Sequence, residues 1–257
     1  MKILAVGDVT SPAGLLHLRG KLWGVRKKYG IDFCIVNGEN ASFITGISAE
    51  GALELLRSGA DVITGGNHTL QNHAAWEMLD ERDDVLRPIN YPKGTPGKGC
   101  TVIDNGKWRV LVISAMGNSY MEPVLDLPYS YIDAALADHA GKYDVAVIDI
   151  HAEATGEKLA VAYNYDGRVQ VIFGTHTHVP TADGRILPCG TGYISDLGMC
   201  GESEGILGMD PETVLTKMRD RLPGKFKRAE GDARADAVIF TLDDKTKRVT
   251  EITRISF

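Results

Sequence analysis

The chain has 257 residues, a hydrophobic fraction of 44% and a formal net charge of −6 at pH 7. This balance is ordinary for a globular protein with a sizeable core, and it argues against non-specific binding to nucleic acid or to an anionic membrane, which need a basic surface. The four cysteines have no C-x-x-C spacing, so neither a zinc ribbon nor a disulfide framework is indicated. We expect a cytoplasmic protein, because the chain begins on a strand-like run without a signal-peptide core and has no apolar run long enough for a membrane span.

The first third of the chain alternates between strand and helix patterns. Its predicted strands are 2–7, 32–40 and 61–68, and its predicted helices are 13–29, 48–58 and about 72–80. Ser48 is the expected N-cap of the second helix, with Glu50 in the first turn. An irregular stretch rich in proline and glycine follows, at 88–99.

The second half continues in the same style. Its predicted elements are a hairpin at 101–105 and 108–114, a strand at 144–151, a helix at about 153–162, strands at 169–173 and within 186–195, a helix opened by Asp210-Pro211, and a C-terminal hairpin at 235–256. The sequence therefore predicts one α/β domain over residues 1–257, with sheets covered by helices.

Residues able to bind a metal follow five of the apolar runs. They are Asp8, Glu39 with Asn40, Asn67 with His68, His151, and the H-x-H pair His176 and His178. Ligands of α/β proteins bind beyond the carboxyl ends of the strands, so these side chains are expected in one region. Carboxylate, amide and imidazole groups suit divalent ions, and their number suits two ions bridged by a carboxylate.

Each of these residues also has a structural explanation. Asp8 and Asn67 can form turns or caps, Glu39 and Asn40 can lie in a solvated loop, and His151 can be a hydrogen-bonded core histidine. The ordered set as a whole favours metal binding. Other H-x-H enzymes fit less well: the metallo-β-lactamase pattern H-x-H-x-D-H fails because Val179 and Pro180 follow His178, and amidohydrolase barrels carry H-x-H on their first strand.

These motifs resemble the calcineurin-like binuclear metallophosphoesterases, and more specifically their YmdB-like branch. The matching stretches are GDV (7–9), NGENA (37–41), GNHT (66–69), RPINYPKGTPGKG (87–99), HAEATGEKLA (151–160), GTHTHVPTAD (174–183) and GILGMDPET (205–213). Thr10 stands where the wider superfamily has a histidine, and Glu39-Asn40 replace an aspartate, as in the YmdB-like branch. The resemblance implies a four-layer α/β/β/α sandwich of two facing mixed sheets.

The resemblance also implies a ligand set for two metal ions. One ion would be held by Asp8, Glu39, Asn40 and His178, and the other by Glu39, Asn67, His151 and His176. Glu39 would bridge the two ions. The family generally uses iron or manganese, and the donor types admit zinc as well.

The expected activity is hydrolysis of a phosphoester by a metal-bridging hydroxide, with His68 as the general acid. The branch is associated with cyclic nucleotide phosphodiesterase activity, so a small phosphodiester or nucleotide is the expected substrate. The alternatives are a phosphomonoesterase or nucleotidase of the same chemistry, and a metal-containing regulatory nucleotide-binding protein. A homo-oligomer is a family-level expectation.

Four further residues have open roles in this hypothesis. Arg87 and Arg185 can either hold phosphate or lie on the surface. Glu153 can either orient a ligand or cap a helix. Thr175 is expected in the turn that aims the two histidines of the H-x-H pair.

Overall fold

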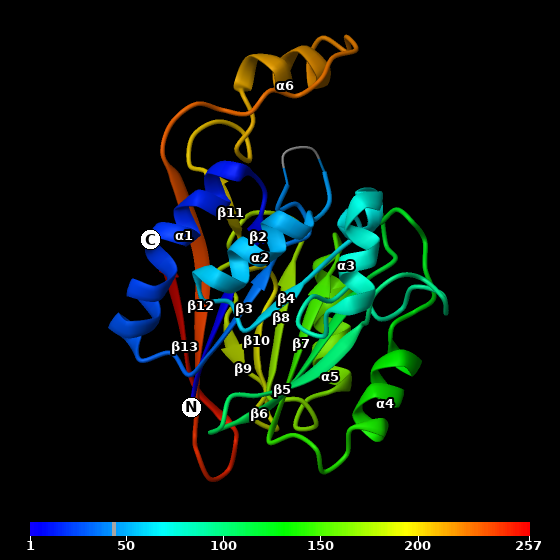
Figure 1. Cartoon of the computed structure of the whole chain (residues 1–257), viewed down its shortest axis with the longest axis vertical. Helices are drawn as coiled ribbons and strands as arrows, with labels where there is room; N and C mark the ends of the chain where they lie inside the picture. Colours follow the sequence, from blue (N-terminus) through cyan, green and yellow to red (C-terminus); the bar gives the residue numbers. More distant parts are fainter. Residues whose placement is uncertain (43–44) are drawn as a thin grey trace.

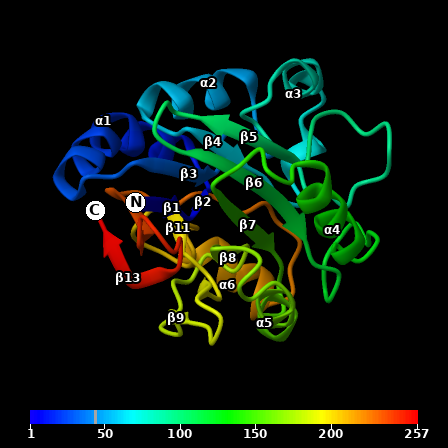
Figure 2. The same ribbon diagram turned by 90° about the horizontal axis from the view of Figure 1, so that it is seen from below.

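The computed structural model describes residues 1–42 and 45–257. Within these residues two β-sheets face each other, and helices cover the outer face of each sheet (Figure 1 and Figure 2). The architecture is the four-layer α/β/β/α sandwich that the family resemblance implies.

The first sheet contains seven strands. They are β1 (Lys2–Val6), β2 (Asp8–Val9), β3 (Phe33–Asn37), β4 (Val62–Thr64), β11 (Met199–Glu202), β12 (Ala233–Leu242) and β13 (Val249–Ser256). Their order is β2-β11-β12-β1-β3-β4, with β13 paired to β12. Strands β1, β3 and β4 are parallel, and β12 is antiparallel to β1, β11 and β13, so the sheet is mixed.

The second sheet contains six strands. They are β5 (Cys100–Asp104), β6 (Arg109–Met116), β7 (Val145–His151), β8 (Val171–Thr175), β9 (Arg185–Ile186) and β10 (Gly192–Ile194). Strands β6, β7, β8 and β10 are parallel, whereas β5 and β9 form antiparallel edges. The parallel strands of both sheets end on the same side of the molecule (Figure 1).

Two groups of helices cover the sheets. The helices are α1 (Pro12–Tyr29), α2 (Ala49–Ser58), α3 (Trp76–Glu81), α4 (Tyr129–Asp138), α5 (Thr155–Asn164) and α6 (Pro211–Met218). Helices α1 and α2 pack on the first sheet, and α4 and α5 pack on the second. The predicted caps are confirmed: the Ser48 side chain accepts a hydrogen bond from the Gly51 amide at 3.0 Å, and Asp210 accepts one from the Thr213 amide at 3.0 Å.

Alternating side chains of the strands fill three layers of core. In β6, Val110 and Val112 pack between the sheets, whereas Leu111 and Ile113 pack outward under α4 and α5. This alternation follows from the period of two residues in a strand. Both faces of the central strands are therefore buried, as their nearly continuous apolar sequences predict.

The structure differs from the predicted elements in three places. The predicted helix at 72–80 is replaced by two 3₁₀ turns, Thr69–Gln71 and His73–Ala75, followed by α3. The break occurs because Asn72 is extended and its side chain accepts a hydrogen bond from the Ala74 amide, which caps a new turn. Helix α4 and strand β11 were not predicted. None of the described helices has the length and apolarity that crossing a membrane requires.

Candidate metal centre

Strand ends from both sheets bring the predicted ligands together. Asp8 lies in β2, Glu39 follows β3, Asn67 follows β4, His151 ends β7, and His176 follows β8 directly. The two sheets face each other, so the loops after β3 and β4 meet those after β7 and β8. This is the arrangement that the strand-end pattern predicts.

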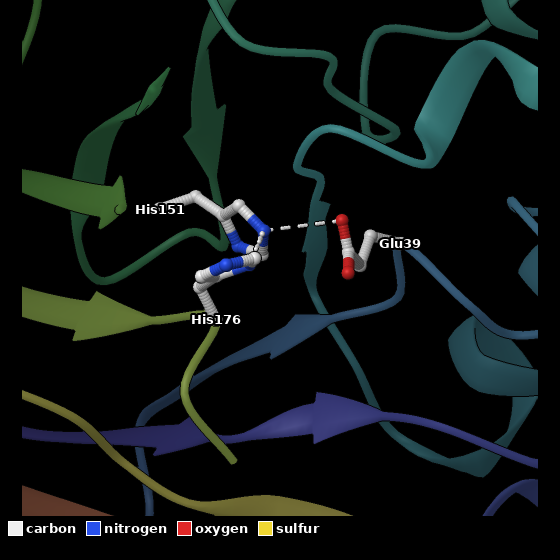
Figure 3. Close-up of side chains that lie close together, drawn as sticks. All are labelled: Glu39, His151 and His176. Atoms are coloured by element: carbon white, nitrogen blue, oxygen red, sulfur yellow. Dashed lines mark hydrogen bonds and ion pairs between the residues drawn. The ribbon is translucent and has the colours of Figure 1, made fainter. Parts of the chain in front are cut away.

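Three donor atoms surround Nε2 of His151. This nitrogen lies 3.0 Å from Asn67 Oδ1, 3.2 Å from Glu39 Oε2 and 3.2 Å from His176 Nδ1. Figure 3 shows the two imidazoles stacked edge to face, with the His151 ring turned to the Glu39 carboxylate. Donor atoms that share one first-row ion at about 2.0–2.2 Å are separated by roughly 3.0–3.5 Å, so these residues fit an ion.

Asp8 provides a second indication of a cation. Its side chain is fully buried, and its Oδ2 accepts a hydrogen bond from the His176 amide at 2.8 Å. Its Oδ1 has no hydrogen-bond partner among the described residues. His151 Nδ1 lies 3.7 Å from this oxygen, too far for a hydrogen bond. A buried carboxylate oxygen without a hydrogen bond is costly, and a cation would satisfy it. His178 Nε2 lies 3.8 Å from Asp8 Oδ2, close enough to share that cation.

The close packing around position 66 explains why a glycine precedes Asn67. A Cβ atom at this position would lie 2.3 Å from both Glu39 Oε2 and His151 Nε2. Any other residue would therefore fill the space in which the donor atoms converge.

The charges of the centre also suit a cation. Burial opposes the ionised form of Glu39, but His151 and His68 hold the pKa of its carboxyl well below the usual value. Burial likewise opposes protonation of His151, yet Glu39 and Asp8 raise the pKa of its imidazole to about 9. In the metal-free chain the proton on His151 thus balances the negative charge of the nearby carboxylates. A bound cation would displace this proton.

Asn40 and His68 lie at the rim, beside Glu39. Asn40 Nδ2 donates to Glu39 Oε1 at 2.9 Å, and Asn40 Oδ1 accepts a hydrogen bond from the Gly46 amide at 3.2 Å. The amide would have to turn over to offer its oxygen to an ion. His68 contacts Glu39 Oε1 through Nδ1 at 3.1 Å, and its side chain is 33% exposed. The structure therefore places His68 beside the predicted ligands but open to solvent.

A buried relay orients His151. The Thr175 hydroxyl donates its proton to Asp149 Oδ1 at 2.7 Å, so it must accept the hydrogen bond from His151 Nδ1 at 2.9 Å. Nδ1 then carries a proton, and Nε2 is the nitrogen left for a metal. Asp149 is fully buried and also accepts hydrogen bonds from Thr64 and Asn37.

Sequence reasoning missed this relay. Thr175 ends strand β8 instead of lying in the turn, and Asp149 was not singled out. The sequence did contain a feature that could have identified Asp149, because it is an acidic residue inside the apolar run of β7.

We expect Thr175→Val to weaken metal binding by about 10–100-fold, the usual effect of removing a group that orients a ligating histidine. Valine has a similar shape but cannot accept the His151 Nδ1 proton. Calorimetric titration of chelator-stripped protein with Mn²⁺ measures the effect. Thr175→Ser keeps the hydroxyl and is the matched control, so equal affinities for Val and Ser variants would contradict the relay.

The H-x-H turn has a strained backbone. His176 and His178 have φ angles of 102° and 63°, in the left-handed region that non-glycine residues rarely adopt. Each such residue costs about 1–3 kcal/mol unless its surroundings fix it. Asp8 accepts from the His176 amide at 2.8 Å, and Asp196 accepts from the Thr177 amide at 3.1 Å, so carboxylates hold the turn from both sides.

Asp196 is itself held by a buried lysine. Lys158 Nζ lies 2.8 Å from Asp196 Oδ2, and both side chains are buried. Sequence reasoning missed this pair because the two residues lie 38 positions apart, and Asp196 lies outside the motifs that the sequence analysis singled out.

Besides Thr175, the structure also places the other three residues whose roles the sequence left open. Glu153 Oε2 lies 3.3 Å from His176 Nε2, which agrees with a role in orienting that ligand. Arg87 is buried and donates from Nη1 to the Pro88 carbonyl at 2.8 Å, and Arg185 lies in the exposed strand β9. Among the described contacts neither arginine touches the predicted ligands.

The comparisons with known proteins cover nearly the whole chain. The model of the YmdB-like protein family matches residues 4–255. A 2′,3′-cyclic-nucleotide 2′-phosphodiesterase of Bacillus subtilis is 43% identical, over 99% of this chain and 96% of the relative. The crystal structure of a hypothetical protein from Thermus thermophilus is similar at a TM-score of 0.91 with 37% identity, and covers 100% of this chain and 99% of that one. A crystal structure of a novel phosphatase from Mycoplasma pneumoniae has a TM-score of 0.91 and 32% identity, with 100% and 93% covered. The chain belongs to the YmdB-like family, and it is a hydrolase of phosphoester bonds.

Proposed function

We propose that this chain hydrolyses 2′,3′-cyclic nucleotides in a metal-dependent reaction. The observation that carries the proposal is the convergence of Asn67 Oδ1, Glu39 Oε2 and His176 Nδ1 within 3.2 Å of His151 Nε2. The substrate class follows from the name of the Bacillus subtilis relative, which matches this chain over nearly its whole length.

The proposed ligands form two overlapping sets. Asp8, Glu39, Asn40 and His178 would hold one ion, and Glu39, Asn67, His151 and His176 would hold the other. Iron or manganese suits this mixture of oxygen and nitrogen donors. When bound, such cations supply Lewis-acid activation of water at neutral pH and offset the charge of the phosphate.

In the proposed reaction water adds to phosphorus and the bond from phosphorus to the ribose O2′ breaks. The product is a nucleoside 3′-phosphate, and O2′ must take up a proton as it leaves. We propose that His68 donates that proton. The contact of its Nδ1 with Glu39 Oε1 at 3.1 Å and its partly exposed ring support this role.

Hydrolysis of 2′,3′-cyclic AMP tests this function. Chelator-stripped protein is assayed before and after Mn²⁺ is restored, and the products are separated by chromatography. We expect metal-dependent formation of 3′-AMP. Release of inorganic phosphate from 3′-AMP, without ring opening of the cyclic substrate, would instead support the phosphomonoesterase alternative.

His68→Ala distinguishes a proton donor from a positioning residue. We expect it to slow hydrolysis of 2′,3′-cyclic AMP by about 10²–10⁴-fold. Hydrolysis of bis-p-nitrophenyl phosphate should suffer far less, because its leaving group needs no proton. Equal losses on both substrates, with unchanged metal content, would show that His68 only positions Glu39.

A further inference from the structure

An open pocket adjoins the candidate metal centre on the side of Asn67. It has a volume of about 380 Å³ and is lined by Asn67, Leu70, Gln71, Tyr91, Glu122 and Pro123. This volume lies within the range of about 300–1,000 Å³ that is typical of small-molecule sites. Asn67 belongs to both the pocket and the ligand set, so a nucleotide whose phosphate reaches the metal centre would extend into this pocket.

Hydrogen bonds fix the loop that carries Glu122 and Pro123. Asn118 Oδ1 accepts from the Leu125 amide at 2.9 Å, and the Asn118 side chain donates in return to the Leu125 carbonyl. Asn90 Nδ2 donates to the Asp126 carbonyl at 2.8 Å and to the Met116 carbonyl at 2.9 Å, which ties both ends of the loop together. The pocket wall is therefore formed before a ligand arrives, which lowers the entropic cost of binding.

The opposite walls are also well anchored. Leu70 and Gln71 lie in the 3₁₀ turn Thr69–Gln71, and the Thr69 hydroxyl accepts a hydrogen bond from the Gly66 amide at 2.8 Å. Tyr91 is buried, with 8% of its surface exposed. Leu70 and Pro123 are accessible and offer apolar faces, as a flat heterocycle requires.

Glu122 sets the polarity of this pocket. It is exposed and is the lining residue that carries a formal charge. A negative charge next to the site of an anionic phosphate is unfavourable unless hydrogen-bond donors of the substrate face it. Guanine has two adjacent donors, N1–H and the N2 amino group, which match the two oxygens of a carboxylate. Adenine, cytosine and uracil lack such a pair of adjacent donors.

We propose that this pocket binds the nucleobase of the substrate and that Glu122 makes guanine the preferred base. The inference rests on the proposed function, because it places the cyclic phosphate at the metal centre. Beyond the proposed function, the inference names the base that the pocket prefers and the residue that selects this base.

The test compares kcat/KM for the 2′,3′-cyclic phosphates of guanosine, adenosine, cytidine and uridine with the Mn²⁺-loaded protein. A bidentate contact predicts that the guanosine substrate is favoured by roughly 5–150-fold. Glu122→Gln should remove most of this preference, because it lowers kcat/KM for the guanosine substrate relative to that for the adenosine substrate. Glu77→Gln, which neutralises an exposed carboxylate of α3 that does not line this pocket, is the matched control.

Two outcomes would overturn the inference. Equal kcat/KM for the four substrates, or a guanosine preference that survives Glu122→Gln, would show that Glu122 does not select the base. A lack of turnover on all four would contradict the proposed function instead. Calorimetric binding of 3′-GMP and 3′-AMP decides the base preference in that case, because equal affinities would contradict it without any need for hydrolysis.

Discussion

Glu39→Gln is expected to lower metal-dependent turnover by at least roughly 10²–10³-fold, which corresponds to a loss of several kcal/mol of charge stabilisation. Glutamine has nearly the same shape, but it carries no charge and offers one oxygen in place of two. Glu39 uses both oxygens in this structure, with Oε2 at 3.2 Å from His151 and Oε1 at 3.1 Å from His68. This use of both carboxylate oxygens is why we propose Glu39 as the bridge between two ions.

The experiment measures metal content and turnover of 2′,3′-cyclic AMP on the same samples. Glu77→Gln removes an exposed carboxylate of α3 and should retain both properties. Full turnover and metal content in Glu39→Gln would show that Glu39 is not a ligand. The regulatory alternative makes a different prediction. A Glu39→Gln protein that has no turnover, but keeps its fold, its nucleotide binding and any regulatory effect of the wild type in cells, would favour a regulatory binding protein over an enzyme.

The parts of this protein that could be predicted from its sequence are those with a local signal. Strands such as β7 can be predicted because they are apolar runs, and helix α2 can be predicted from its N-cap residue Ser48. The predicted ligands were found because each follows a strand, and the geometry of parallel sheets then brings strand ends together. Whether they bind ions in the proposed sets stays a prediction.

The remaining features depend on tertiary contacts that leave no local pattern. Helix α4 was missed because no side-chain N-cap marks its start after the irregular stretch. The roles of Asp149 and Tyr91 depend on which strand or loop lies opposite, and spacing along the chain does not encode that. Sequence motifs therefore identified the residues that we propose as metal ligands, whereas the groups that hold them in place required the structure.

The buried pair Lys158 and Asp196 is the clearest of these holding groups. The Lys158 side chain crosses behind Gly174, where a Cβ would lie 2.6 Å from Lys158 Cδ, and its Nζ meets Asp196 at 2.8 Å. Asp196 also accepts hydrogen bonds from the Thr177 amide at 3.1 Å and the Gly198 amide at 3.0 Å. The pair thereby connects α5 to the strained turn that carries His176 and His178.

Lys158→Met is expected to destabilise the protein by about 3–5 kcal/mol, because it leaves the Asp196 carboxylate buried without a counter-charge. Urea unfolding of the metal-free protein measures this loss. The double variant Lys158→Met/Asp196→Asn should recover much of the stability, since the amide is neutral and keeps one acceptor oxygen for the turn.

Metal affinity separates two explanations of this pair. If the pair holds the H-x-H turn, the double variant should still bind Mn²⁺ more weakly than the wild type even where its stability has returned, because a neutral amide with one acceptor oxygen holds the turn less firmly than the carboxylate does. If the double variant binds Mn²⁺ as tightly as the wild type, Asp8 alone suffices to fix the turn, and Lys158 and Asp196 contribute to folding only. A cost below about 1 kcal/mol for Lys158→Met would contradict the buried ion pair itself, since an exposed pair is worth no more than that.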